Sequence, residues 1–148
     1  MRDEIDSCKF VYLRYLGEPE DNALRIVIEE AKADGPAQDV EVLPGHVLSG
    51  SRAIESDETC RTFELFWSSY VAYSVRNESF CTLDNSEVHE GRLFCVYSKS
   101  HFLDYVSRAT FAREDYPGPL QHWGINCLNH VIDVVFTKEP TVRCTAEA

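Results

Sequence analysis

The chain has 148 residues, of which 44% are hydrophobic and 26% are charged. These values are typical of one globular domain and exclude a fibrous repeat or a largely disordered chain. The formal net charge of −11 at pH 7 repels phosphate backbones, so nucleic-acid binding is not expected. The negative charge favours a basic protein partner, and the alternative is an acidic surface that serves only solubility.

The first residues indicate a cytoplasmic protein. Residues 1–6 are acidic where a signal peptide is basic and then apolar, and no run of 18 apolar residues follows. We therefore expect no contact with a membrane. The six cysteines are widely spaced and include no Cys-x-x-Cys pair: Cys8, Cys60, Cys81, Cys95, Cys127 and Cys144. This pattern predicts reduced, mostly buried thiols rather than a disulfide framework or a zinc site.

The first 54 residues predict one hairpin and two further short strands. Residues 9–30 predict a hairpin, because two β-favouring runs flank the turn-forming residues 17–22. Residues 31–45 predict a loop interrupted by a short strand around Val40–Val42, and a further strand is expected from His46 to Ile54.

The segment Thr62 to Asn77 has the strongest strand pattern in the chain. Apolar residues alternate with polar ones before and after Ser68-Ser69. We expect a bend or bulge at the two serines, which would let one strand serve two parts of a curved sheet.

The second half predicts two more strands and one short helix. Residues 92–97 read as a strand, and residues 100–106 have helical spacing with Ser100 as the cap. A loop is expected at 116–119, and residues 122–137 return to strand composition. The whole chain, 1–148, is thus predicted to be a single mainly β domain on the border with α+β, an antiparallel sandwich or half-open barrel with one short helix.

The stretch His122 to Asp133 is the first candidate binding site, because polar groups interrupt an apolar strand there. On one continuous strand Cys127 and His130 point to opposite faces, which weakens a Cys/His nucleophile. His122 and His130 share a face but lie about 26 Å apart, at roughly 3.3 Å per residue. No metal site is therefore expected unless the strand breaks between them. We assign His122, Asn129 and His130 to binding. The alternative is that His130, Asn129 and Asp133 are structural polar groups that bond the backbone.

The run 70–79 is the second candidate, because a strong strand ends there in polar residues. We assign to binding the residues Tyr70, Tyr73, Arg76, Asn77 and Glu78. Tyr and Arg are the residue types that dominate interface hot spots. The alternative is that a tyrosine fills the edge of the core with its hydroxyl in water.

Asp104 and Tyr105 on the predicted helix complete the candidate binding residues. Asp104 offers an acid for general acid/base work, although a solvated helix face explains it equally well. The sequence contains no P-loop, no G-x-G-x-x-G, no G-x-S-x-G and no H-E-x-x-H. We therefore assign no catalytic residue, no cofactor and no metal.

Three runs are similar to a group of small uncharacterised bacterial proteins: residues 70–79, 98–105 and 129–135. The likeness spans roughly residues 62–140 and brings no function with it. It implies a bacterial cytoplasmic origin and a meeting of the three runs in space.

The sequence favours a non-enzymatic protein-binding module, such as an immunity-type or antitoxin-like inhibitor of a basic partner, because of its size, its charge and its missing catalytic motifs. The alternative is a small-molecule-binding protein or hydrolase-like enzyme whose pocket is formed by the runs 70–79, 98–106 and 122–133. Such a pocket would be lined by Tyr73, Asn77, Tyr105, Asn129 and His130. The oligomeric state does not follow from the sequence.

Overall fold

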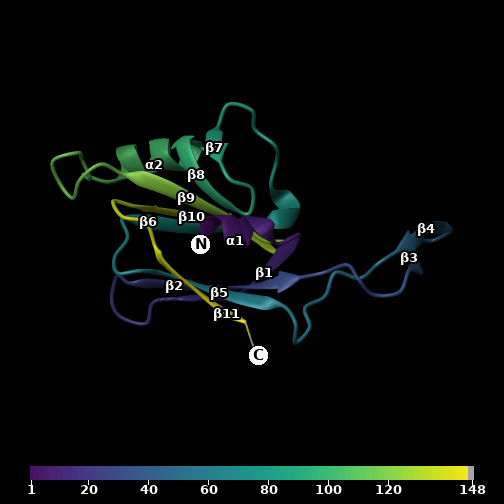
Figure 1. Cartoon of the computed structure of the whole chain (residues 1–148). Helices are drawn as coiled ribbons and strands as arrows, with labels where there is room; N and C mark the ends of the chain where they lie inside the picture. The colour runs from purple at the N-terminus through teal and green to yellow at the C-terminus, as the bar shows by residue number, and fades with distance from the viewer. Residues whose placement is uncertain (147–148) are drawn as a thin grey trace.

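The computed structural model describes residues 1–146, whose strands form two antiparallel sheets in face-to-face layers and a separate hairpin (Figure 1). The four strands of the first sheet are ordered β1-β2-β5-β11. Their bounds are β1 Phe10–Gly17, β2 Leu24–Ala31, β5 Arg61–Trp67 and β11 Thr141–Ala146. The predicted hairpin over residues 9–30 is confirmed, because β1 and β2 pair antiparallel.

The second sheet has five strands in the order β6-β10-β9-β8-β7. Their bounds are β6 Ala72–Asn77, β7 Val88–Glu90, β8 Phe94–Lys99, β9 Gln121–Asn126 and β10 His130–Phe136. Neighbouring strands pair antiparallel throughout. Mainly antiparallel β structure with a short helix is therefore confirmed, and the sheets form a sandwich that is not closed into a barrel.

The core lies between the sheets, because alternation along each strand sends every second side chain inward. The inward side chains of the two central strands of the first sheet are all buried: Leu24, Ile26, Ile28, Phe63, Leu65 and Trp67. Trp67 meets Trp123 of the second sheet with their ring centroids 6.1 Å apart. One hydrophobic cluster thus draws on both sheets and holds the layers together.

The predicted bend at Ser68-Ser69 has a larger role than expected. β5 ends at Trp67 and β6 begins at Ala72, and the two strands belong to different sheets. The residues between them carry the chain from one layer to the other. The expectation of one strand in a curved sheet is therefore corrected to two strands in separate sheets.

The predicted single strand over 122–137 is also corrected, because it is a hairpin of β9 and β10. The chain turns at residues 127–129, where the Cys127 amide donates to the His130 carbonyl at 2.8 Å. Asn126 consequently lies opposite Val131. Apolar residues on both sides of the turn had concealed it.

Helix α2 (His101–Ala109) covers the outer face of the second sheet (Figure 1). Its predicted cap is confirmed, since Ser100 Oγ accepts the Leu103 amide at 3.0 Å. Val106 is buried, and Thr110 ends the helix. Two further helical segments were not predicted, α1 (Arg2–Ser7) and the 3₁₀ turn η1 (Glu78–Phe80).

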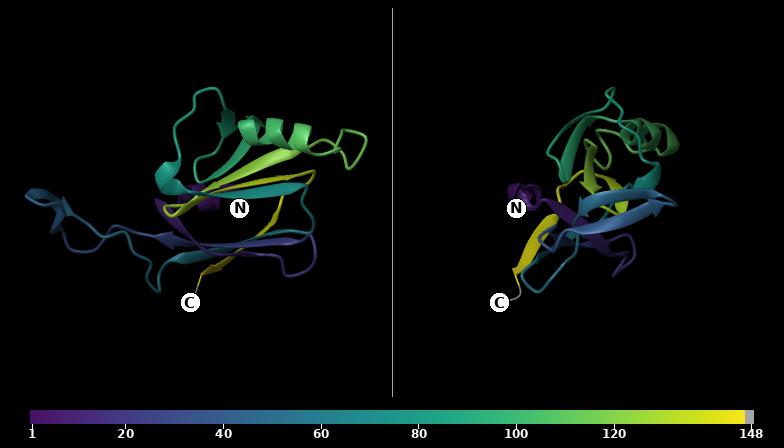
Figure 2. Two further views of the ribbon diagram at one scale, coloured as in Figure 1. Left: turned by 180° about the vertical axis from the view of Figure 1, so that it is seen from behind. Right: turned by 90° about the vertical axis from the view of Figure 1, so that its right-hand side faces the viewer.

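Strands β3 (Gln38–Leu43) and β4 (His46–Ser51) pair only with each other. The left view of Figure 2 shows this hairpin projecting away from the sandwich. Pro44-Gly45 forms its tip, and Gly45 has φ of +81°, a conformation that favours glycine in a turn after proline. We name residues 38–51 the arm. None of the helices in the described part of the chain is long and apolar enough to span a bilayer.

Candidate functional site

The arm is the most unusual surface of the described chain, because its apolar side chains have no core to enter. Its large apolar residues are between 44% and 64% exposed: Val40, Val42, Leu43, Val47 and Leu48. Val40 lies opposite Leu48, so these two share one face of the hairpin. An isolated two-stranded hairpin is marginally stable in water, and contiguous exposed apolar groups mark contact surfaces.

The charges of the arm have one sign. It carries Asp39 and Glu41 but no lysine or arginine. Each carboxylate accepts a backbone amide of the arm itself, at Gly50 (3.2 Å) and at Gly45 (2.9 Å). The arm therefore presents exposed apolar side chains together with two carboxylates.

The base of the arm is fixed to the first sheet. Lys32 and Glu55 exchange two backbone hydrogen bonds of 2.9 and 3.0 Å. The Tyr12 hydroxyl on β1 donates to the Ile54 carbonyl at 2.9 Å, and Ser56 Oγ donates to the Glu30 carbonyl at 2.8 Å. These bonds hold the two segments that connect the arm to the sandwich, close to the first sheet.

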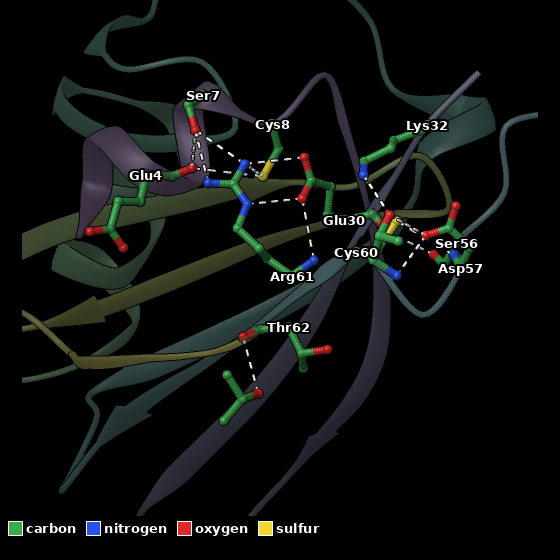
Figure 3. Close-up of polar contacts among 12 residues, drawn as sticks. Glu4, Ser7, Cys8, Glu30, Lys32, Ser56, Asp57, Cys60, Arg61 and Thr62 are labelled. Atoms are coloured by element: carbon green, nitrogen blue, oxygen red, sulfur yellow. Dashed lines mark hydrogen bonds and ion pairs between the residues drawn. The ribbon is translucent and has the colours of Figure 1, made fainter. Parts of the chain in front are cut away.

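Next to this base, Arg61 and Glu30 form a two-pronged ion pair (Figure 3). Arg61 Nε and Nη2 lie 2.9 and 3.1 Å from the two oxygens of Glu30. The guanidinium also reaches Ser7 Oγ at 3.2 Å and Cys8 Sγ at 3.1 Å, which joins α1 to the first sheet. The hydrogen bond from Arg61 holds the pKa of Glu30 below its ordinary value.

The cysteines near this pair are not poised for chemistry. Burial raises the pKa of Cys8 to about 11, and nearby Glu30 adds to the rise, so the thiol stays protonated at neutral pH. Burial raises the pKa of Cys60 as well. All six cysteines are free, and four of them are buried.

A second candidate lies beneath α2 on the outer face of the second sheet, where five polar side chains form a chain of hydrogen bonds. Ser100 Oγ lies 2.7 Å from His122 Nδ1, and His122 Nε2 lies 2.9 Å from Asp133 Oδ1. The other carboxylate oxygen accepts Arg76 Nη2 at 2.9 Å and Ser74 Oγ at 3.2 Å. Ser100, His122 and Asp133 are each at most 3% exposed.

One assignment of protons gives each of the buried side chains Ser100, His122 and Asp133 a matching hydrogen-bond donor or acceptor. The Leu103 amide donates to Ser100 Oγ, the serine hydroxyl donates to His122 Nδ1, and the Nε2 proton of His122 goes to Asp133. Burial by itself raises the pKa of Asp133, but the His122 hydrogen bond and the Arg76 charge outweigh it and hold that pKa below its ordinary value. Asp133 is therefore ionised at neutral pH.

Aromatic rings enclose the imidazole of His122. Tyr97 stacks on it with ring centroids 4.3 Å apart, and Phe102 of α2 meets it edge-on at 5.5 Å. The Tyr97 ring fits because residue 124 is glycine, since a Cβ there would lie 2.7 Å from Tyr97 Cε2. Ser, His and Asp thus have the order of a hydrolytic triad, but the serine is 3% exposed and occupied as a helix cap. A substrate would reach it only after α2 moved.

Two residues assigned to binding from the sequence, Arg76 and His122, meet in this network through Asp133. The runs 70–79, 98–106 and 122–133 do lie together, because β6 pairs with β10, β10 with β9 and β9 with β8. Outward polar side chains of these runs form the hydrogen-bonded network beneath α2, whose own first residues belong to the run 98–106.

Three further residues assigned to binding from the sequence lie outside this network: Asn129, His130 and Asn77. The side chain of Asn129 bonds both backbone groups of Leu13, at 2.9 and 3.1 Å, and so ties the β9–β10 turn to β1. His130 lies opposite Asn77 in the sheet, and its Nδ1 is buried without a hydrogen-bond partner among the described residues. Asn77 caps η1 by accepting the Ser79 amide at 3.0 Å.

Tyr70 and Tyr73 form a T-shaped pair with ring centroids 4.9 Å apart. Tyr73 packs against the core, and the Tyr70 hydroxyl donates to Glu18. This hydrogen bond raises the pKa of Tyr70 to about 12. Glu78 is exposed on η1.

Asp104 and Tyr105 are exposed on α2. With His101 and Arg108 they line a shallow hollow of about 490 Å³. Tyr105 is thus on the helix that covers the second sheet, whereas Asn129 is bonded to the first sheet. The five residues of the pocket inferred from the sequence are not brought together.

Two features of the structure were missed in the sequence. The arm was assigned only as two short strands, although its Val and Leu residues on both sides of Pro44-Gly45 were a usable signal of a hairpin. Asp133 was considered only as a structural polar group of the stretch 122–133 and Ser100 only as a helix cap, so their contacts with His122 were not expected. That cluster depends on the turn at 127–129, which carries no glycine or proline.

Comparisons of the chain with protein-family models, with curated proteins and with solved structures find no match. The geometry of the arm and of the buried network is therefore the basis for function.

Proposed function

We propose that this protein is a non-enzymatic binding module whose arm docks onto a basic protein partner, in the manner of an immunity-type or antitoxin-like inhibitor. The single observation that carries the proposal is the projection of an apolar hairpin from the sandwich. Burying its valine and leucine side chains against a partner is favourable, at roughly 25 cal/mol per Å² of apolar surface.

The negative charge of the arm and of the whole chain favours a basic protein as the partner. The arm carries only acidic charges, and the whole chain has a net charge of −11. A basic protein is attracted to such a surface, and its encounter is accelerated. A second copy of the chain carries the same net charge and is repelled, so it is the less favoured occupant.

The fixed base of the arm adds to the affinity. The backbone pair between Lys32 and Glu55 fixes the two segments that lead to and from the hairpin before any partner arrives. A preorganised element loses less conformational entropy on binding than a loop that must first become ordered.

The test is capture of partners from a lysate of the organism that makes the protein, followed by binding measurements on each purified partner. The arm variant V40S/L48S removes two apolar side chains that share a face. The matched control is L83S, because Leu83 is fully exposed on a loop outside the arm. We expect a basic partner that binds the wild type and L83S, releases as salt is raised, and loses at least about tenfold in affinity with V40S/L48S.

Two results would overturn the proposal. One is an arm variant that retains every partner with the wild-type affinity. The other is a stable dimer of the chain alone that V40S/L48S dissociates, since the arm would then serve self-association.

A further inference from the structure

We propose that Asp84, Glu87 and His101 form a binding site for a late first-row divalent cation such as Zn²⁺. Asp84 Oδ2 lies 2.5 Å and Glu87 Oε1 lies 4.0 Å from His101 Nε2. One ligand atom from each residue lies within 4.8 Å of the other two. This site is separate from the arm and does not depend on the proposed function.

Strand pairing brings the three residues together. Val88 on β7 lies opposite Lys99 on β8. Glu87 directly precedes Val88, and His101 begins α2 two residues after Lys99. Glu87 also accepts the His101 amide at 3.3 Å, so the carboxylate is held against the first turn of the helix. The remaining ligand, Asp84, is placed by a turn in which it accepts the Ser86 amide at 2.8 Å.

The spacing suits an ion after a small adjustment. Ligand atoms about 2.1 Å from a tetrahedral ion lie roughly 3.4 Å from each other. His101 and Asp84 must therefore separate by about 1 Å, and Glu87 must approach. Both side chains of the His101–Asp84 pair are well exposed, at 67% and 40%, so their rotamers are free to make this change.

Charge near His101 also favours a cation. Asp104 stands one helical turn after His101 and adds a third carboxylate near the imidazole. Arg108 of the same helix, which lines a hollow together with His101 and Asp104, offsets part of this charge. The three carboxylates outnumber that single arginine.

The ligand set selects the class of ion. One imidazole with two carboxylates suits Zn²⁺ and its neighbours, whereas Mg²⁺ and Ca²⁺ prefer sites made of oxygen alone. The three residues span 18 positions without a recognised motif, which is why only the folded chain shows them.

The experiment is calorimetric titration of the tag-free protein with Zn²⁺ and, separately, with Mg²⁺. The variants H101A and D84N each remove one ligand, and H46A removes an exposed histidine on the arm as the matched control. We expect one Zn²⁺ per chain in the wild type and in H46A, affinity at least about tenfold weaker in H101A and D84N, and no heat from Mg²⁺. A Co²⁺ titration followed by NMR should broaden the ring signals of His101 first.

Unchanged Zn²⁺ affinity in both H101A and D84N would overturn the site, as would the absence of Zn²⁺ binding to the wild type. The two variants change exposed residues on different segments. If the circular dichroism spectrum of either variant matches that of the wild type, a loss of Zn²⁺ affinity in that variant is not caused by misfolding.

Discussion

Asp133 is the most deeply buried carboxylate of the described residues, since it is 2% exposed and lies on the inner strand β10. Hydrogen bonds from His122 and Arg76 keep it ionised. Removing one partner from such a pair leaves an uncompensated buried group, which costs more than the pair contributes. The network therefore makes the position of α2 over the sheet depend on a few side chains.

The variant D133N should lower the free energy of unfolding at pH 7 by about 1–3 kcal/mol, because it weakens the buried hydrogen bonds to His122 and Arg76. The folded-state pKa of Asp133 is below its ordinary value. Its stabilisation is therefore present above the unfolded-state pKa of about 3.9 and is lost as pH falls through the folded-state pKa. Urea unfolding from pH 7 to pH 2.5 should show the gap between the two proteins narrowing below about pH 4.

The control for this measurement is D104N, which makes the same change at an exposed position on α2. Its stability should stay within about 0.5 kcal/mol of the wild type. A gap between the wild type and D133N that stayed constant down to pH 2.5 would contradict an ionised, paired Asp133.

At the scale of elements, the arm and the sandwich have different roles. The sandwich buries the apolar faces of both sheets, whereas β3 and β4 contribute no residue to the core cluster of the described chain. A hairpin kept exposed in this way gives little stability to the fold. Its apolar side chains are explained by contact with something outside the chain.

Replacing residues 36–52 by a short Gly-Ser-Gly turn should change the free energy of unfolding by less than about 1 kcal/mol, because shortening a surface loop has a small entropic effect. Chemical denaturation of both proteins measures this. As a reference, I28A in the core of β2 should cost about 2–5 kcal/mol. A loss of that size on removing the arm would show that the arm supports the fold.

At the scale of the whole molecule, the net charge of −11 counters the exposed apolar surface of the arm. Charge repulsion keeps such surfaces of separate copies apart in solution, and this protection weakens as the net charge approaches zero. The isoelectric point calculated from the sequence is about 4.8.

The wild type should therefore self-associate near pH 4.8 and far less at pH 7. Light scattering across this range measures the effect. The variant V40S/L48S should associate less than the wild type at pH 4.8, while L83S should behave like the wild type. If all three proteins associated equally, a surface other than the arm would be responsible for the self-association.

Local patterns were enough to predict much of the fold. The β1–β2 hairpin, the strands on either side of Ser68-Ser69 and the helix capped by Ser100 all follow from alternation, turn residues and capping. The turn at 127–129 was not predicted, because Cys127, Leu128 and Asn129 carry no strong turn signal. Missing it separated His122 from Asp133, which the hairpin places on neighbouring strands.

The sequence by itself determined the β character of the chain, the short helix and the acidic charge, because each depends on residues near one another or on a simple sum. Only the tertiary structure decided which strands share a sheet, which polar residues meet under α2 and which valines and leucines stay exposed. These outcomes depend on pairings between distant residues. Burial of a side chain is settled by what packs against it, and for the arm nothing in the described chain does.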